Sequence, residues 1–517
     1  MVVASHTSSL PRAEWTIAVA DEAGTARIAT AIAASLKAGQ IVTLSGDLGA
    51  GKTAFARALI RNLTGDPALE VPSPTFTLMQ FYDGTSFPIV HADFYRVNSA
   101  DELDELGFDE TLDRALMIVE WAERVGVLET AERLDVRLVS DPASGPQARR
   151  ITLTGFGHFA EGIARSRRIE DFLDASGRGG VRRVPVQGDA STRAYERLIL
   201  PDGRSEILMI APKRPDGPPV RAGKSYSAIA HLAESVHAFV AIANGLRAQD
   251  LSAPTILSAN LDAGLLLVED LGSEGVIDAE RKPIRERYEA AIDTLLHLHE
   301  ETLPDVLPVA GKEIYTIPPY DLDAMLIEAE LLLDWYAPHI AKTEVSGSMR
   351  GHFIRLWREA FAFLEGQPKT WVLRDYHSPN LIWLPQRESV KRIGIIDFQD
   401  ALIGPPAYDV VSLAQDARIA VDEETELALF ARYVMGRRKA DGTFDAAAFG
   451  RAYALMGAQR ATKILGIFAR LDKRDGKPAY LKHLPQITAY LRRNLRHESL
   501  ADLSVWYDTY LPQLVRD

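Results

Sequence analysis

The 517-residue sequence contains no cysteine. Disulfides, thiolate nucleophiles and cysteine-bound zinc or iron are therefore excluded, and any metal ion must be held by oxygen or imidazole ligands. No run approaches the roughly 18 apolar residues that a membrane-spanning helix needs, and residues 1–15 lack the basic start and apolar stretch of a signal peptide. We expect a cytoplasmic protein that does not contact a membrane.

An excess of positive charge is also missing. The chain carries a net charge of -13, and residues 1–165 alone hold 14 Lys or Arg against 22 Asp or Glu. Broad binding to nucleic acid needs the opposite sign. If the protein serves RNA chemistry, we expect it to act through protein partners and to contact the RNA only indirectly.

The length exceeds what one hydrophobic core supports, which predicts two or three domains. Short apolar runs alternate with helical patterns in the first part and predict an α/β domain with a largely parallel sheet. Beyond a charged stretch with glycines near residue 180, a strand-rich region precedes a mostly helical one, the layout of a bilobal kinase. We expect a P-loop domain over 1–165, a kinase N-lobe over 166–273 and a helical C-lobe over 274–517.

One motif in the first domain is typical of a phosphate-binding loop. It fits G-x-x-x-x-G-K-[ST] and lies between the strand IVTLS and a helix, as the motif requires. Its backbone amides would face phosphates, its lysine would reach the β and γ oxygens, and its threonine hydroxyl would bind magnesium. The nucleotide-binding candidates are Gly46, Asp47, Leu48, Gly49, Ala50, Gly51, Lys52 and Thr53.

Two acids that follow apolar strands are candidates for the metal and for hydrolysis. Asp93 ends PIVHAD, and Glu120 follows LMIV, where it would hold the metal or orient the attacking water. Ser73 and Thr75 lie where a switch segment that senses the γ-phosphate would lie. His91 reads as a strand-end histidine whose hydrogen bonds are satisfied.

The motifs GDLGAGKT, VPSPTFTL, HADFYR and VEW together resemble the TsaE family of bacterial ATPases over roughly residues 10–160. The resemblance implies that ATP turnover supports threonylcarbamoylation of the tRNA adenosine beside the anticodon, with TsaB/TsaD-like proteins as partners. It also implies nucleotide and Mg²⁺ binding by Lys52 and Thr53, and metal binding and hydrolysis by Asp93 and Glu120. The residues that it adds to the site are Thr75 in the switch, Tyr95, Arg96 and Trp121.

A second constellation has the spacing of a kinase catalytic loop. Asp375 precedes Asn380 by five residues, and Asp397 follows the apolar strand GII 22 residues after Asp375. Asp375 would be the catalytic base that orients the acceptor hydroxyl, and Asn380 and Asp397 would bind metal. Leu373 and Gln399 depart from the protein-kinase pattern, so a protein substrate is not expected.

Other candidates in this region would bind the nucleotide. GDASTRAY offers Gly188 and Ser191 to cap phosphates, and the backbone near Glu269 to Leu271 would pair with adenine. Lys213, near the end of the strand SEILMI, is the candidate phosphate-binding lysine, although the neighbouring prolines leave its register open. Tyr320 would either shape the acceptor pocket or pack at a helix start.

The motifs GDASTRAY, LRDYHSPNLIWL and IIDFQDALIGPPAYDVVSL make residues 170–510 resemble the aminoglycoside phosphotransferase-like family. More narrowly, they resemble the cell-wall sugar kinases that phosphorylate the anomeric hydroxyl of N-acetylmuramate or N-acetylglucosamine. ATP and Mg²⁺ are the implied cofactors. An aminoglycoside, choline or another amino alcohol remains an alternative acceptor. A further alternative is that one module binds nucleotide as a regulatory unit without turnover of its own.

Overall fold

The chain divides into two compact units, Met1–Val181 and Arg182–Asp517. The computed structural model describes residues 12–33, 35–97, 111–125, 133–186, 193–213 and 216–516. The domain boundary expected at 165/166 falls inside helix α5 (His158–Ala175), which packs on strands of the first unit. The first unit therefore extends about one helix further than the sequence indicated.

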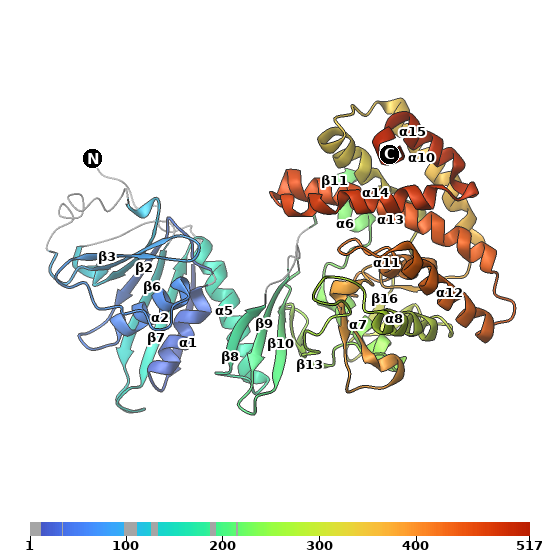
Figure 1. The fold of residues 1–517 in the computed structure, drawn as a ribbon. Helices are drawn as coiled ribbons and strands as arrows, with labels where there is room; N and C mark the ends of the chain where they lie inside the picture. Colours follow the sequence, from blue (N-terminus) through green and yellow to red (C-terminus); the bar gives the residue numbers. More distant parts are fainter. Residues whose placement is uncertain are drawn as a thin grey trace. The chain divides into compact units, whose positions relative to one another are not determined.

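The described residues of the first unit form a seven-stranded sheet in the order β1-β7-β6-β2-β5-β4-β3 (Figure 1). The central strands pair in parallel, as predicted, whereas the strands toward both edges pair antiparallel. The turn residues DPASGPQ join β6 to β7 in an antiparallel hairpin. The strands are β1 (Arg12–Val19), β2 (Ile41–Ser45), β3 (Met79–Asp83), β4 (Pro88–Asp93), β5 (Leu116–Glu120), β6 (Arg133–Ser140) and β7 (Arg149–Phe156).

Parallel pairing brings the carboxyl ends of three strands, with the predicted site residues, to one edge of the first sheet. Strands β2, β4 and β5 are nearly continuous apolar runs buried along their length, as parallel strands covered on both faces are. Their carboxyl ends share an edge, and Asp93 and Glu120 are register partners there. The helices are α1 (Glu22–Ala33), α2 (Lys52–Thr64), which follows β2 after the phosphate-binding loop, and α5.

The described part of the second unit opens with a five-stranded antiparallel sheet in the order β13-β14-β10-β9-β8. Its strands are β8 (Arg182–Val186), β9 (Ala194–Ile199), β10 (Ser205–Ile210), β13 (Ile256–Asn260) and β14 (Leu265–Glu269). The described part of this unit also contains four short antiparallel pairs, the first of which lies between β10 and β13 in the chain. They are β11 (Pro219–Arg221) with β12 (Lys224–Ser225), β15 (Val306–Pro308) with β16 (Ile314–Thr316), β17 (Thr370–Val372) with β20 (Leu402–Gly404), and β18 (Leu381–Trp383) with β19 (Ile393–Ile395).

The rest of the second unit is mainly helical, which confirms the predicted strand-rich and helix-rich lobes. A π-helical stretch, Leu332–Ile340, continues helix α9 (Leu322–Leu331). Within the described ranges, no helix is both long enough and apolar enough to cross a membrane. The helices are α6 (Tyr226–Ile229), α7 (Val236–Ala248), α8 (Arg285–Leu298), α9 (Leu322–Leu331), α10 (Gly347–Phe361), α11 (Ala407–Ala414), α12 (Glu423–Ala440), α13 (Ala446–Asp475), α14 (Leu484–Leu495) and α15 (Ala501–Tyr510).

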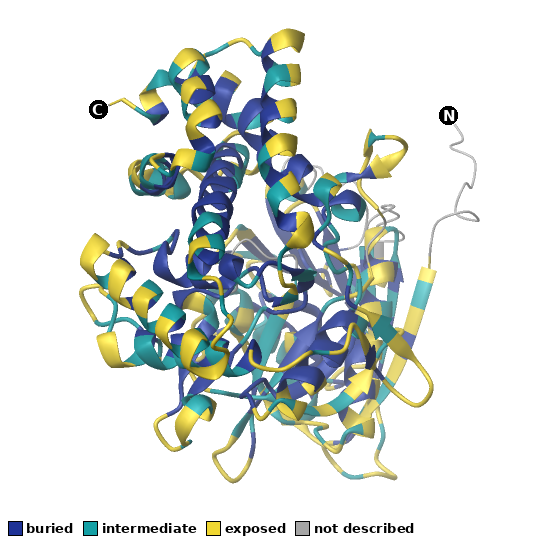
Figure 2. Cartoon of the chain, turned by 90° about the vertical axis from the view of Figure 1, so that its right-hand side faces the viewer, coloured by how far each residue is buried: buried dark blue, intermediate teal, exposed yellow. Residues whose placement is uncertain are grey.

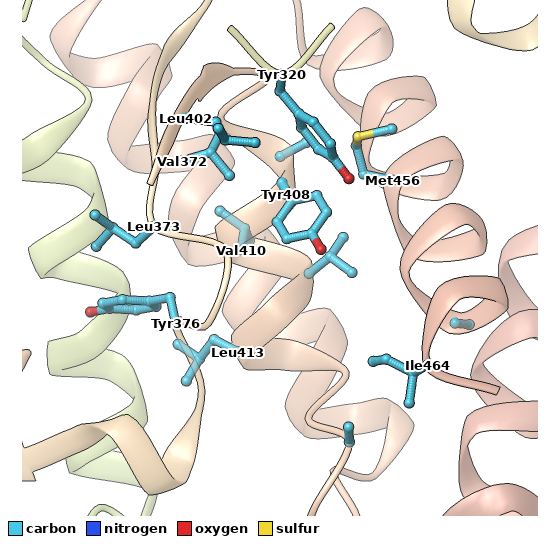
Figure 3. Close-up of a cluster of buried hydrophobic side chains, with 14 of the residues drawn as sticks. Tyr320, Val372, Leu373, Tyr376, Leu402, Tyr408, Val410, Leu413, Met456 and Ile464 are labelled. Atoms are coloured by element: carbon cyan, nitrogen blue, oxygen red, sulfur yellow. The ribbon is translucent and has the colours of Figure 1, made fainter. Parts of the chain in front are cut away.

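Helix α13 is the central element of the helical lobe and is buried along much of its length (Figure 2). At Gly466 it approaches the end of α9 so closely that a Cβ would lie 2.3 Å from the carbonyl carbon of Leu331. Tyr408 and Met456 pack near the strand that leads to the predicted catalytic loop (Figure 3). The predicted active residues are thus mounted on a rigid apolar core.

Candidate nucleotide sites

The phosphate-binding loop of the first unit has a backbone that only glycine adopts freely. Gly46, Gly49 and Gly51 have φ angles of 134°, 79° and 104°. At Gly46, a Cβ would also lie 2.2 Å from the carbonyl oxygen of Leu138. The glycines of the motif are therefore required by the curl of the loop as well as by phosphate approach.

Lys52 is buried beneath this loop and braces it. Its ammonium donates to the carbonyl oxygens of Gly46 at 2.7 Å and Asp47 at 3.0 Å. It also lies 3.5 Å from the ring centroid of Trp121, a cation–π contact. Burial lowers the pKa of Lys52, and the carboxylate of Glu120 acts in the opposite direction.

A second cation, which no sequence motif indicates, also holds the loop. Arg149, the first residue of β7, donates from Nε to the carbonyl oxygen of Ala50 at 2.9 Å. Its Nη1 donates to the carbonyl oxygen of Ala148 at 2.9 Å. The guanidinium thus ties the crest of the loop to the neighbouring hairpin.

The two predicted acids lie beside the first turn of α2. Thr53 Oγ1 donates to Glu120 Oε2 at 3.0 Å. His91 is fully buried, and its Nε2 lies 2.9 Å from Glu120 Oε1, so it orients this carboxylate. We expected both ring nitrogens of His91 to be hydrogen-bonded. Only Nε2 meets this expectation, because Nδ1 has no hydrogen-bond partner among the described residues.

Asp93 is bonded to the predicted switch segment. Its Oδ2 accepts from Ser73 Oγ at 2.5 Å and from Thr75 Oγ1 at 2.9 Å. Its Oδ1 accepts from the backbone amide of Tyr95 at 2.9 Å. A ligand that binds the Asp93 carboxylate would therefore weaken its hydrogen bonds from Ser73 and Thr75.

Aromatic and cationic side chains continue the site beyond the acids. The rings of Tyr95 and Trp121 are 5.2 Å apart, and Arg96 lies over the ring of Phe76 at 4.4 Å. Trp121 has a φ of 60°, an uncommon conformation for a large side chain and one that marks functional segments. Loop amides, one ammonium, one hydroxyl and two carboxylates form a donor set that fits a magnesium-bound triphosphate.

The predicted catalytic loop of the second unit is held by a buried acid. Asp409 accepts from the backbone amides of Leu373 at 2.6 Å and Arg374 at 3.0 Å. Burial raises the pKa of Asp409 to about 7 even though both amides favour its charged form. Asn380 Nδ2 donates to the carbonyl oxygen of Asp375 at 2.9 Å, which closes the loop.

Asp397 lies next to this loop, and its φ of 58° is again uncommon. Burial, followed by the nearby Asp375 carboxylate, raises its pKa. Gln399 Nε2 donates to Asp397 Oδ1 at 2.8 Å, so the residue that departs from the D-F-G pattern fixes the carboxylate. Adjacent carboxylates and an amide oxygen suit Mg²⁺, which is commonly held by one or two carboxylates together with substrate phosphates.

A buried charge network below the loop was not predicted. Glu328 forms ion pairs with Arg374 and, at 2.8 Å, with Lys463 Nζ. Burial alone would raise the pKa of Glu328, but Lys463 and Arg374 lower it to about 2. Tyr320 donates to Glu328 Oε2 at 2.6 Å, and it also lines a cavity of about 380 Å³ with Met325.

The other residues predicted to bind nucleotide in the second unit differ in where the structure places them. Gly188 and Ser191 lie outside the described residues. Lys213 is exposed after β10. The Glu269 amide donates to the Thr255 carbonyl oxygen at 2.9 Å, and its carboxylate accepts from Arg387 at 2.5 Å. The backbone amide of Glu269 is therefore already hydrogen-bonded within the sheet. The Leu271 side chain lies beside Gly394 on β19.

These folds and sites define a chain that joins a P-loop nucleotide-binding unit to a phosphotransferase-like unit with a kinase catalytic loop. Residues 19–151 match the model of the family described as threonylcarbamoyl adenosine biosynthesis protein TsaE. Residues 182–443 match the model of the phosphotransferase enzyme family, APH. The chain belongs to the phosphotransferase enzyme family and carries a TsaE-family domain before it.

Individual relatives cover the two units separately. An N-acetylmuramate/N-acetylglucosamine kinase of Caulobacter vibrioides is 40% identical over 355 residues, which cover 66% of this chain and 95% of that protein. The protein with the same name from Pseudomonas aeruginosa is 33% identical over 326 residues, 62% of this chain and 86% of that protein. A tRNA threonylcarbamoyladenosine biosynthesis protein TsaE of Rickettsia felis is 43% identical over 118 residues, 23% of this chain and 68% of that protein.

Proposed function

We propose that the chain is a bifunctional enzyme whose two units each use ATP in the cytoplasm. The first hydrolyses ATP in support of threonylcarbamoylation of the tRNA adenosine next to the anticodon. The second transfers a phosphoryl group to the anomeric hydroxyl of a cell-wall amino sugar, N-acetylmuramate or N-acetylglucosamine. The juxtaposition of Asp375 and Asp397 carries the kinase proposal, together with the 40% identity to a kinase named for these sugars.

In the second unit, Asp375 acts as the catalytic base. It accepts the proton of the sugar hydroxyl while that oxygen forms a bond to the γ-phosphorus and the bond from this phosphorus to the ADP oxygen breaks. Asn380 and Asp397 would hold Mg²⁺, which would offset negative charge on the phosphates. Asp409 and Asn380 keep the loop in the geometry that this proton transfer needs.

In the first unit, Lys52 binds the β and γ phosphates after leaving its carbonyl partners in the loop. Thr53 and Asp93 would hold Mg²⁺, which would offset charge on the triphosphate, and Glu120 orients the attacking water. His91 supports this role because it fixes the Glu120 carboxylate. The bonds from Ser73 and Thr75 to Asp93 would then report to the switch segment whether a metal-bound triphosphate is present.

Exposed apolar side chains next to the first site support a protein partner. Leu48 in the loop is 85% exposed and Phe76 in the switch is 83% exposed. A large apolar side chain left in water beside an active site is typical of an interaction surface. We propose that TsaB/TsaD-like proteins dock here and that tRNA is contacted only indirectly, in line with the net negative charge.

The kinase proposal is tested with a panel of acceptors. The purified chain is incubated with ATP, Mg²⁺ and N-acetylmuramate, N-acetylglucosamine, kanamycin or choline, and ADP release is measured. We expect turnover with the amino sugars, loss of their reducing end, and no turnover in Asp375→Asn. Phosphorylation of kanamycin or choline alone would reject the sugar assignment.

The ATPase proposal is tested by measuring hydrolysis with and without TsaB/TsaD-like proteins. Partner proteins should stimulate hydrolysis, and Lys52→Ala should abolish the stimulated rate. Phe76→Ser should reduce stimulation while leaving nucleotide affinity unchanged, because this side chain faces solvent. Nucleotide binding without hydrolysis, even with the partners present, would favour the alternative of a regulatory unit.

A further inference from the structure

Arg193 lies immediately before β9 and faces the predicted metal-binding acid of the second unit. Its Nη1 is 3.6 Å from Asp397 Oδ1, and its side chain is only 19% exposed. Among the described residues, Asp375, Asp400 and Arg193 act on the charge of Asp397, and Arg193 is the one of these three that is positively charged. An ATP tail brought to such a cluster needs positive charge besides the metal ion.

The strand that follows supplies a second, independent observation. Side chains two residues apart lie on the same face of a strand, which places Arg193, Tyr195 and Arg197 in one row. Burial, and then the nearby Asp397 carboxylate, raise the pKa of Tyr195 to about 12, so this residue lies within electrostatic range of the acid. At the other end of the row, Arg197 Nε donates to Asp270 Oδ2 at 2.7 Å.

This row of side chains spans the nucleotide site that the proposed function requires. From Arg193 to Arg197 the strand rises by roughly 13 Å. It therefore leads from Asp397, where the phosphates belong, to the segment after Glu269, where the base is expected. Glu196, which lies between the two ends, instead pairs with Arg183 at 2.5 Å on the opposite face.

The predicted lysine is less well placed for this task. Lys213 is exposed, and its charge acts on Glu234. A hydrogen bond with Asp216 is the main cause that raises the pKa of Glu234, and Lys213 partly offsets this rise. Arg193 combines a fixed position with a planar guanidinium, which binds phosphate through two parallel hydrogen bonds.

We propose that Arg193, and not Lys213, is the side chain that binds the triphosphate tail of ATP in the second unit. This inference rests on the proposed kinase function. In the absence of nucleotide, the guanidinium offsets the charge of Asp397. Once Asp397 is engaged with Mg²⁺, the same guanidinium donates to phosphate oxygens.

The test measures nucleotide binding by calorimetry in the full chain carrying Lys52→Ala, which removes the first site. We expect Arg193→Gln to weaken MgADP binding about 10- to 100-fold and to leave adenosine binding unchanged, because only the phosphates lose a partner. Arg193→Lys should lose less affinity. Arg204→Gln, in an exposed pair with Asp202 in the turn between β9 and β10, is the matched control.

The outcomes separate this inference from the kinase proposal. If Asp397→Asn keeps full MgADP affinity and sugar-dependent turnover, the kinase site itself is wrong. If Asp397→Asn loses MgADP affinity and sugar-dependent turnover, but Arg193→Gln binds MgADP as tightly as Arg204→Gln does, only the role of Arg193 is overturned. A loss in Lys213→Gln instead of Arg193→Gln, or an equal loss of adenosine binding in Arg193→Gln, would overturn it as well.

Discussion

Replacing Glu328 by Gln should destabilise the second unit strongly. Glu328 is fully buried and is the negative charge between Arg374 and Lys463. Glutamine keeps the size of the side chain and an oxygen that accepts from Tyr320, so the substitution removes charge more than shape. Taking one partner from a buried ion pair costs about 3–5 kcal/mol, since the remaining charges are left without compensation.

Calorimetry of the full chain measures this cost. The first unit is a separate compact unit and provides an internal reference, so we expect its unfolding to be unchanged. A loss of this size should lower the unfolding temperature of the second unit by roughly 4 to 7 °C. Because Arg374 belongs to the catalytic loop, turnover should fall with stability.

Two further variants make the argument specific to charge compensation. Lys463→Met leaves the pair of Arg374 and Glu328 intact and should therefore cost less than Glu328→Gln. Glu359→Gln, which removes an exposed ion pair with Arg355 on α10, should have no measurable effect. A loss below about 1 kcal/mol in Glu328→Gln, or a larger loss in Lys463→Met, would refute the reasoning.

Three other predictions concern acid stability and the phosphate-binding loop. The pKa of Glu328 is about 2 in the folded chain against an ordinary 4.5, so its ionised form should contribute about 3 kcal/mol above pH 4.5, lost as the pH falls toward 2. Denaturant unfolding between pH 5 and pH 2.5 should therefore show a steeper decline in wild type than in Glu328→Gln. Gly46→Ala should remove nucleotide binding from the first unit, measured by calorimetry, because its Cβ would meet the Leu138 carbonyl. Arg149→Gln should weaken this binding about 3- to 10-fold through loss of the bond to Ala50.

Each of these predictions has its own control. Parallel pH dependence in wild type and Glu328→Gln would contradict the ionised state assigned to this group. Gly49→Ala is matched to Gly46→Ala, because Gly49 also has a positive φ but no atom within 4 Å of an added Cβ, and it should be milder. Equal effects of the two alanines, or an unchanged affinity in Arg149→Gln, would count against the account of the loop.

The parts predicted from sequence depend on local spacing. The phosphate-binding motif occupies eight contiguous residues, and Asp93 and Glu120 directly follow apolar runs, so parallel pairing alone brings them together. By contrast, Arg149 lies 99 residues from Ala50. Glu328, Arg374 and Lys463 likewise come from distant segments, and no periodicity in the sequence indicates which buried charges will meet.

The domain boundary was misplaced for a different reason. The segment ARSRRIEDFLDA belongs to a charged stretch, but its apolar residues recur at helical spacing and face the first sheet. Its charged residues largely occupy the solvent side of α5. The apolar periodicity of this segment, and not its charge, therefore decides that it belongs to the first unit.

The central claim is that this chain holds two independent pockets for ATP. Equilibrium binding of a nonhydrolysable ATP analogue with Mg²⁺ to the full chain tests it most directly. The account predicts two sites per chain, of which Lys52→Ala removes one and leaves the other unchanged. A single site in the wild type, or loss of both sites in Lys52→Ala, would contradict it.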